Sequence, residues 1–304
     1  MTDLRRIPAV DLRRAETTRT PGSLPENEQG SLVTRFVALL AALLAALLLA
    51  PMAMAAPAQA RTSTARTSTT PTGNDISYPQ CGGSYPSGQS FAIVGVNGGK
   101  ASNFNSCFGS EWSWAQTSKG GTSQAPAQLY INTGNPGDVL AQYNVTDWPT
   151  TSISADPYGT CSGTWTDDRP CAWEYGYERA KADISFFNSA TQTPAGGKWW
   201  LDIETANSWT SDLAKNQASL EGMVYALQQG SAAVGIYSSS GSWSSLFGPV
   251  VASSSLYSLN EWRPGAKTLT RAQSNCSLAP FEGNGAVVIT QYVSTNLDHD
   301  YSCA

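Results

Sequence analysis

The sequence predicts an α/β fold, an irregular barrel of the TIM type that forms one domain. Segments with the pattern of strands alternate with helix-like segments, which indicates a parallel sheet with helices outside it. Six or seven such strands within about 230 residues suit a closed barrel better than a small open sheet. The helical pattern becomes sparse after Tyr237, so we expect the barrel to be irregular in its last third.

The first 60 residues are expected to lie outside this domain. Phe36 to Ala50 is an unbroken apolar run behind Arg35, and Ala-x-Ala sites follow at 53–55 and 58–60. A charged flank, an apolar stretch and small residues are typical of a secretory signal peptide. The run is shorter than the ~20 residues that span a bilayer, so we expect a secreted protein with no stable membrane anchor. The polar segment before it is either a real extension or follows a mis-assigned start.

Residues 61–72 are rich in Thr and Ser and are predicted to be a linker, and residues 73–304 are predicted to be the barrel domain. The predicted strands are 75–77, 91–97, 128–132, 199–205, 232–237, 256–262 and 286–292. Helices are predicted at 111–117, at 177–187 and from Leu213 to Gly230, because apolar residues recur there on one helical face or because Gly residues end the segment. A long irregular insertion is expected at about 147–171.

Six cysteines, an even number, lie in the part of the chain that would be exported, which argues for disulfides. Fifteen pairings are possible, and proximity in the sequence favours Cys81–Cys107, Cys161–Cys171 and Cys276–Cys303. No two cysteines have a Cys-x-x-Cys spacing, so we expect no metal site and no cofactor. The net charge of −5 does not favour a nucleic-acid partner.

The most informative segment is Trp199 to Thr205, an apolar strand that carries two acids. Side chains alternate along a strand, so Asp202 and Glu204 point to one face, while Leu201 and Ile203 point to the other. Two acids on one face resist ionising together, and such pairs are often used for acid–base chemistry. The alternative interpretation is a strand end with two solvated acids.

Other acids are expected near the same end of the barrel. Asp75 ends the first predicted strand, and Asp298 and Asp300 follow the last one. Active sites of parallel barrels form at the carboxyl ends of the strands, so these acids are predicted to converge with the central pair. Glycoside cleavage needs a proton donor with a raised pKa and a second carboxylate, and this set would provide both.

Three motifs in order resemble those of glycoside hydrolase family 25, the lysozyme-type muramidases. They are Asp75-Ile76-Ser77-Tyr78-Pro79-Gln80, Asp202-Ile203-Glu204, and Gln291-Tyr292 followed by Asp298. The resemblance covers roughly Gly73 to Ala304 and implies a (β/α)5β3 barrel that acts on peptidoglycan. A divergent, glycoside-hydrolase-like actinobacterial branch is the other possible placement, because Asn97 stands where these muramidases more often carry a charged residue.

By this resemblance Glu204 is the general acid, and Asp202 assists at the anomeric centre. Asp75 and Asp298 are expected to bind substrate and to tune Glu204. Tyr78, Trp262 and Tyr292 lie next to motif residues and are candidates for stacking on sugar rings, although most aromatic side chains belong to the core.

We therefore expect a secreted, monomeric glycoside hydrolase with a polysaccharide substrate. Two alternatives stay open, a non-catalytic barrel that binds cell wall or carbohydrate, and a hydrolase of another polysaccharide. A serine hydrolase is disfavoured because His299 is the only histidine and no Gly-x-Ser-x-Gly elbow follows a suitable strand.

Overall fold

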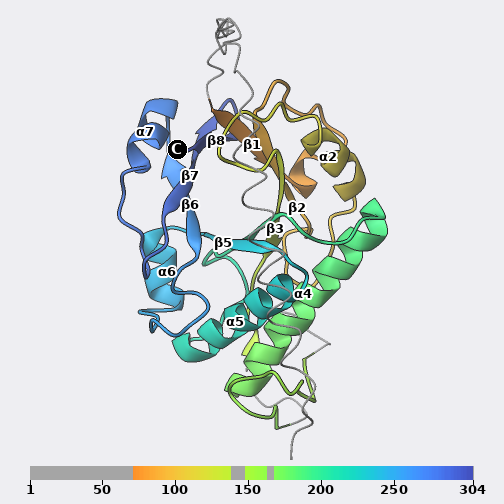
Figure 1. The fold of residues 1–304 in the computed structure, drawn as a ribbon, viewed down its shortest axis with the longest axis vertical. Coiled ribbons are helices and arrows are strands. Elements are labelled where there is room, and N and C mark those ends of the chain that lie inside the picture. Colours follow the sequence, from red (N-terminus) through yellow and green to blue (C-terminus); the bar gives the residue numbers. More distant parts are fainter. Residues whose placement is uncertain (1–70, 138–147, 163–167, 304) are drawn as a thin grey trace, which may run out of the picture. The chain divides into compact units, whose positions relative to one another are not determined.

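The computed structural model of the chain describes residues 71–137, 148–162 and 168–303. In these residues eight strands close into a barrel, and each strand is hydrogen-bonded to its neighbours in chain order (Figure 1). The predicted α/β barrel is thus confirmed. The proposed signal peptide lies outside the described residues, and none of the described helices has the length and apolar character needed to cross a membrane.

The first seven strands run parallel, and the eighth runs antiparallel to both of its neighbours, β7 and β1. The strands are β1 (Thr72–Ile76), β2 (Phe91–Gly95), β3 (Ala127–Asn132), β4 (Lys198–Asp202), β5 (Ala233–Tyr237), β6 (Asn260–Ala266), β7 (Val287–Ser294) and β8 (Leu297–Ser302).

The sequence analysis did not predict β8, and it placed Asp298 and Asp300 after the last strand instead of inside one. A tight turn at Thr295 and Asn296, both with positive φ, folds β8 back onto β7. The residues of β8 that share a face with Asp298 are polar, so the strand lacks the apolar alternation by which half-buried strands are recognised.

In the described part of the chain five α-helices lie outside the barrel: α2 (Phe108–Ala115), α4 (Arg169–Thr191), α5 (Leu213–Gln229), α6 (Ser240–Leu246) and α7 (Leu269–Asn275). The three predicted helices are present, but α4 starts within the stretch that was expected to be irregular. Asp168 caps it by accepting a hydrogen bond from the Cys171 backbone. Helices α6 and α7 were missed because both are short and largely polar. Strand β6 begins four residues later than expected.

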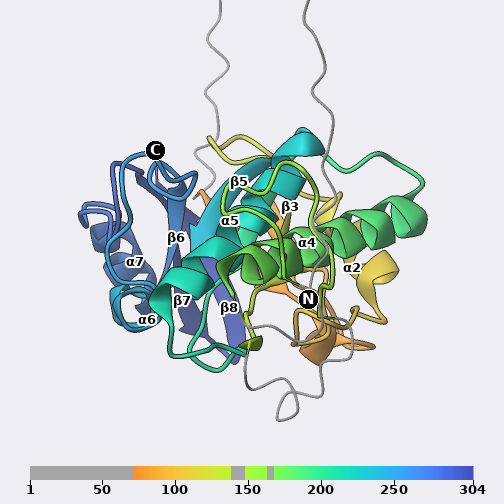
Figure 2. The same ribbon diagram turned by 90° about the horizontal axis from the view of Figure 1, so that it is seen from below.

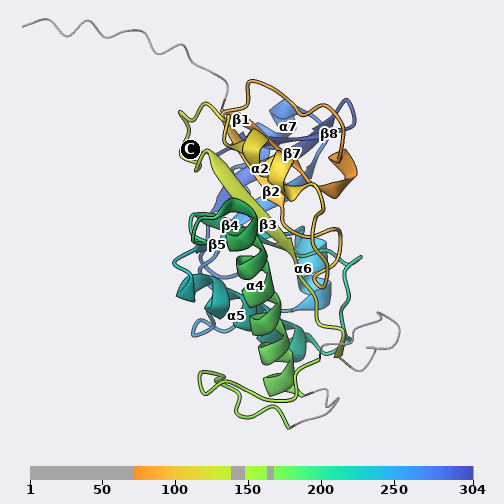
Figure 3. The same ribbon diagram turned by 90° about the vertical axis from the view of Figure 1, so that its right-hand side faces the viewer.

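Helices α4 and α5 cross in close contact on one side of the barrel, as Figures 2 and 3 show. Two glycines at the crossing allow this approach. A Cβ on Gly176 would lie 1.8 Å from the Ser219 carbonyl oxygen, and one on Gly222 would lie 2.0 Å from that of Trp173. The contact holds the two helices together, and β4 lies between them in the chain.

The interior of the barrel has an apolar layer beneath a polar one. Phe91, Ile93, Trp200, Trp262 and Ile289 pack together inside the sheet and are at most 1% exposed. Leu201 and Ile203 face outward and belong to the layer between the sheet and the helices, as the alternation predicted. The apolar inner layer fills the middle of the barrel. Polar side chains nearer the carboxyl ends of the parallel strands line a pocket that opens at those ends.

All three predicted disulfides are present, Cys81–Cys107, Cys161–Cys171 and Cys276–Cys303. Cys303 follows β8 and Cys276 follows α7, so this bond attaches the last strand to the helix before β7. Strand β1 starts at Thr72, one residue before the predicted start of the domain.

Candidate active site

A pocket of about 190 Å³ opens at the carboxyl ends of the barrel strands. Four acids line it together with four other side chains; the eight are Asp75, Tyr130, Asp202, Glu204, Tyr237, Trp262, Gln291 and Asp298. The acids come from three separate places in the chain, strand β1, the end of β4 and strand β8. The barrel therefore brings together the acids that the sequence predicted to converge.

Asp75 and Asp298 occupy facing positions on the antiparallel strands β1 and β8. Gln291 on β7 donates a hydrogen bond from Nε2 to Asp75 Oδ2 at 3.0 Å, and its Oε1 accepts one from the Tyr237 hydroxyl at 2.9 Å. The amide of Gln291 thus orients one acid and one tyrosine of the pocket at the same time.

Asp202 is the last residue of β4 and is 6% exposed. Its Oδ2 accepts a hydrogen bond from Asn132 Nδ2 at 2.7 Å, and its Oδ1 is buried with no hydrogen-bond partner among the described residues. Asn132 is the register partner of Asp202 on the neighbouring strand, which brings the amide next to the acid.

Glu204 lies just beyond the end of β4 and is exposed at the mouth of the pocket. The backbone around it is fixed by two contacts: the Ile203 amide donates to the Tyr237 carbonyl at 2.9 Å, and Trp209 Nε1 donates to the Glu204 carbonyl at 2.9 Å. The deeper acid and the exposed acid therefore meet different environments although only one residue separates them.

The acids of the pocket all have raised pKa values. Burial is the largest cause for each of them, and neighbouring negative charges add to it for all but Asp298. The pKa of Asp75 rises to about 7 through burial and the charge of Asp298. The pKa of Asp202 lies well above its ordinary value through burial and the charges of Glu204 and Asp75. Although residue Glu204 as a whole is exposed, its carboxyl group is partly shielded from water in the pocket; this partial burial raises its pKa, and Asp298 raises it further.

A further acid, Asp300, is buried next to the pocket but does not line it. It is fully buried on β8, and its Oδ1 accepts a hydrogen bond from Trp262 Nε1 at 2.8 Å. Burial, followed by the charge of Asp75, places the pKa of Asp300 well above its ordinary value. Trp262 lines the pocket but is only 1% exposed; its ring belongs to the apolar inner layer, and its indole N–H donates a hydrogen bond to Asp300.

Two aromatic residues predicted to contact substrate do not line the pocket. Tyr78 is 47% exposed and lies over Gly99 of the loop after β2. Tyr292 neighbours Gln291 on β7, so its side chain points to the opposite face of the sheet, where it stacks on His299 with ring centres 5.1 Å apart. Adjacency to a motif residue misled this prediction for Tyr292, because neighbouring strand residues face opposite ways.

Three lining residues were not singled out as site residues: Tyr130, Tyr237 and Gln291. Each lies at or near the carboxyl end of a strand. Which of them lies beside Asp202 follows from the pairing register between neighbouring strands, which the sequence alone does not give. Tyr130 depends on Gly95, since a Cβ there would lie 2.7 Å from the Tyr130 hydroxyl.

A larger cavity of about 510 Å³ lies outside the barrel, against α4, α5 and the segment around Tyr158. Glu221 is the acid that lines it, and both of its oxygens accept hydrogen bonds, one from Tyr158 and one from Ser254. Among the described residues this cavity offers one carboxylate, already engaged in this way, so the smaller pocket with its four acids is the better candidate for acid–base chemistry.

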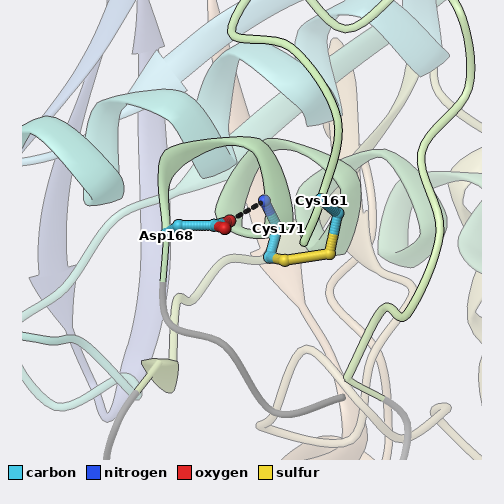
Figure 4. A group of neighbouring side chains, drawn as sticks. All are labelled: Cys161, Asp168 and Cys171. Carbon is cyan, nitrogen blue, oxygen red and sulfur yellow. Dashed lines mark hydrogen bonds between the residues drawn. A yellow bond between two sulfur atoms is a disulfide. The ribbon is translucent and has the colours of Figure 1, made fainter. Parts of the chain in front are cut away.

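One cluster of possible metal ligands, Cys161, Asp168 and Cys171, has another explanation (Figure 4). The two sulfur atoms are bonded to each other, and Asp168 accepts hydrogen bonds from the Cys171 backbone and the Ser162 hydroxyl. The cluster thus joins the start of α4 to the preceding segment.

The model of the family named lysozyme-like protein 1 matches residues 179–276. Comparison with curated protein sequences gives no match. Among solved structures, a lysozyme from Streptomyces coelicolor is 12% identical with a TM-score of 0.47. The aligned region covers 94% of that lysozyme and 78% of this chain. A family GH25 lysozyme from Aspergillus fumigatus is 15% identical with a TM-score of 0.47, with 95% of it and 78% of this chain covered. A muramidase from Trichobolus zukalii is 16% identical with a TM-score of 0.45, with 93% of it and 77% of this chain covered.

The segment that matches the family model runs from within α4 to the end of α7. It contains the central acids Asp202 and Glu204 and leaves Asp75 and Asp298 outside. Over that segment the chain is similar to the lysozyme-like family.

Proposed function

We propose that the protein is a glycoside hydrolase that cleaves the glycan strands of peptidoglycan in the manner of a muramidase. The observation that carries this proposal is the pocket itself, in which four acids with raised pKa values meet at the carboxyl ends of barrel strands. The lysozyme-like family match over the segment with Asp202 and Glu204 supports the choice of substrate. The three disulfides support action outside the cell, and we expect a monomer.

Glu204 is the proposed general acid. A raised pKa keeps a carboxyl protonated closer to neutral pH, as a proton donor requires. Its exposed position at the mouth of the pocket lets it reach the oxygen between two sugar rings. It would donate its proton to that oxygen while the bond to the anomeric carbon breaks.

Asp202 is the proposed assisting acid. It lies deeper than Glu204 in the same pocket, and its Oδ1 has no hydrogen-bond partner among the described residues, so that oxygen is not committed to another protein group. Positive charge develops at the anomeric carbon as the bond breaks, and a nearby carboxylate stabilises it or orients the group that attacks. Asp75 and Asp298 are proposed to bind substrate and to hold the pKa of their neighbours up.

The first prediction is that the purified protein releases reducing ends from bacterial cell walls and that Glu204→Gln abolishes this release. The amide is close in size to the carboxyl but cannot donate a catalytic proton, so we expect a loss of at least about 100-fold. Release of reducing ends is measured, and thermal unfolding checks that the fold is unchanged.

Glu221→Gln is the matched control, since it makes the same change in the larger cavity outside the barrel and should leave the activity as it is. Cleavage of another glycan but not of cell walls would keep the chemistry and replace the substrate. Co-sedimentation with cell walls and no cleavage of any glycan would favour a binding protein instead.

A further inference from the structure

We propose that Asn132 is a positioning residue for Asp202, and that a buried chain of side chains from helix α4 holds it in place. The chain runs from Asp183 through Asn97 to Asn132. The inference rests on the proposed function, in which Asp202 is one of the two central acids.

The first link joins Asn132 to the acid. Asn132 Nδ2 donates to Asp202 Oδ2 at 2.7 Å, and the two residues are 8% and 6% exposed. The other carboxylate oxygen has no hydrogen-bond partner among the described residues. The amide of Asn132 therefore determines which oxygen of Asp202 is held by the protein, and with it the orientation of the carboxyl group in the pocket.

The second link holds the end of β3. The fully buried side chain of Asn97, two residues beyond β2, accepts a hydrogen bond at Oδ1 from the Asn132 backbone N–H at 2.8 Å. This contact fixes the last residue of β3 in the position from which its side chain reaches Asp202. Asn97 faces this interior network, so it does not offer a polar group to the pocket.

The third link fixes the orientation of Asn97. Its Nδ2 donates to Asp183 Oδ1 at 2.8 Å and to the Asn103 carbonyl at 3.0 Å. If the Asn97 amide were reversed, its oxygen would face the Asp183 carboxyl and its NH₂ group would face the N–H of Asn132. The Asn103 carbonyl can only accept and the Asn132 N–H can only donate, so together they select the orientation in which Asn97 donates to Asp183 and accepts from Asn132.

A purely structural role does not account well for this chain. Asp183 is fully buried, and its Oδ2 has no hydrogen-bond partner among the described residues. An unpaired buried carboxyl oxygen lowers stability, and a well-packed apolar side chain at that point of α4 would avoid the cost. Asp183 is thus a costly buried group, and its side-chain hydrogen bond with Asn97 leads toward the pocket.

The test compares Asn132→Ala with Asn105→Ala. Asn105 is also a buried asparagine, and it binds the buried Glu111 at 2.6 Å, but none of its contacts leads to Asp202. For Asn132→Ala we expect kcat to fall about 10- to 100-fold with little change in KM, since the hydrogen bond that orients the Asp202 carboxyl group is lost. Asn105→Ala should lower the unfolding temperature and leave kcat within about twofold.

A second readout does not depend on cleavage. A hydrogen bond donated to a carboxylate favours its ionised form, so its removal should move the titration of Asp202 to higher pH. NMR of protein labelled at the aspartate carboxyl carbon measures this, with Asp202→Asn identifying the signal. If the wild type cleaves no glycan, the proposed function fails, and this titration still tests the positioning role.

Variants of Asp183 test the end of the chain that lies farthest from Asp202. Asp183→Asn retains an acceptor oxygen for Asn97 and should keep kcat near that of the wild type, whereas Asp183→Ala should lower kcat in the same direction as Asn132→Ala. This pair carries the test if Asn132→Ala does not fold. The proposal is overturned if Asn132→Ala, or Asp183→Ala in its place, changes the unfolding temperature alone and leaves kcat and the Asp202 titration at their wild-type values.

Discussion

At the scale of single residues, the pocket separates two acids by depth. Asp202 is buried and bound by Asn132, whereas Glu204 is exposed at the mouth. Because the strand ends at Asp202, the chain is free to turn after it, and that turn is held by Trp209 and Tyr237. Asp202 and Glu204 are only two residues apart in the sequence, yet they differ in their access to water and to substrate.

The charge of Asp298 should be visible in the pH profile of Glu204. Burial raises the pKa of Glu204 first, and Asp298 raises it further. A general acid must be protonated, so activity falls as pH rises through its pKa. Asp298→Asn removes a negative neighbour, lowers the pKa of Glu204, and should move the falling limb of the kcat profile to lower pH. An unchanged limb, or a shift to higher pH, would contradict the assignment of Glu204; Glu221→Gln is the control.

At the scale of elements, the crossing of α4 and α5 depends on glycine for reasons of space. Gly222 faces the backbone of α4 at Trp173. Backbone atoms, unlike the end of a flexible side chain, cannot move aside to make room for a Cβ. The same helix pair lies on either side of β4 in the chain, and α4 carries Asp183. The position of the crossing therefore also affects the buried chain that reaches Asp202.

Gly222→Ala should destabilise the protein, although alanine normally favours helix. Its Cβ would lie 2.0 Å from the Trp173 carbonyl oxygen, and overpacking of this kind costs about 1–3 kcal/mol or more. Gly109→Ala in α2 is the matched control, because nothing lies within 4 Å of its Cβ position and the change should stabilise by about 0.5–1 kcal/mol. Urea unfolding measures both, and equal effects would show that the crossing is not tight.

Elements also show how far the sequence analysis could reach. The apolar strands and the long helices α4 and α5 were predictable, because they bury a regular apolar face. Strand β8 was not, since its inward positions are the acids of the site itself. The candidate acids were found from motifs and strand ends, but Gln291, Tyr237 and Asn132 gain their importance from cross-strand register, which no local pattern encodes.

At the scale of the whole molecule, the barrel contains several acids that prefer to be neutral. The pKa of Asp75 rises from 3.8 to about 7, and that of Asp183 rises from 3.8 to about 8, in both cases mainly through burial. A folded protein that holds protons more tightly than the unfolded chain is stabilised at low pH.

The unfolding temperature should therefore fall as pH rises. For a group with a raised pKa, the contribution to stability is complete below the unfolded value near 3.8 and is lost as pH rises to the folded value, here about 7 to 8. Scanning calorimetry at pH 5 and pH 8 should give the lower midpoint at pH 8. Asp183→Asn removes one of these groups and should reduce the difference, whereas a higher midpoint at pH 8 would contradict the proposed burial of these acids.

The pairing of β1 with β8 has a consequence for the connectivity of the domain. Thr72 at the start of β1 faces Tyr301 near the end of β8, and both lie at the opposite end of these strands from Asp75 and Asp298. A short peptide could join the two ends, and the chain could be opened instead at a surface loop, to give a circularly permuted protein. Cargo fused at either end of the domain would leave on the side away from the pocket, so the barrel is suited to tethering without obstruction of its mouth.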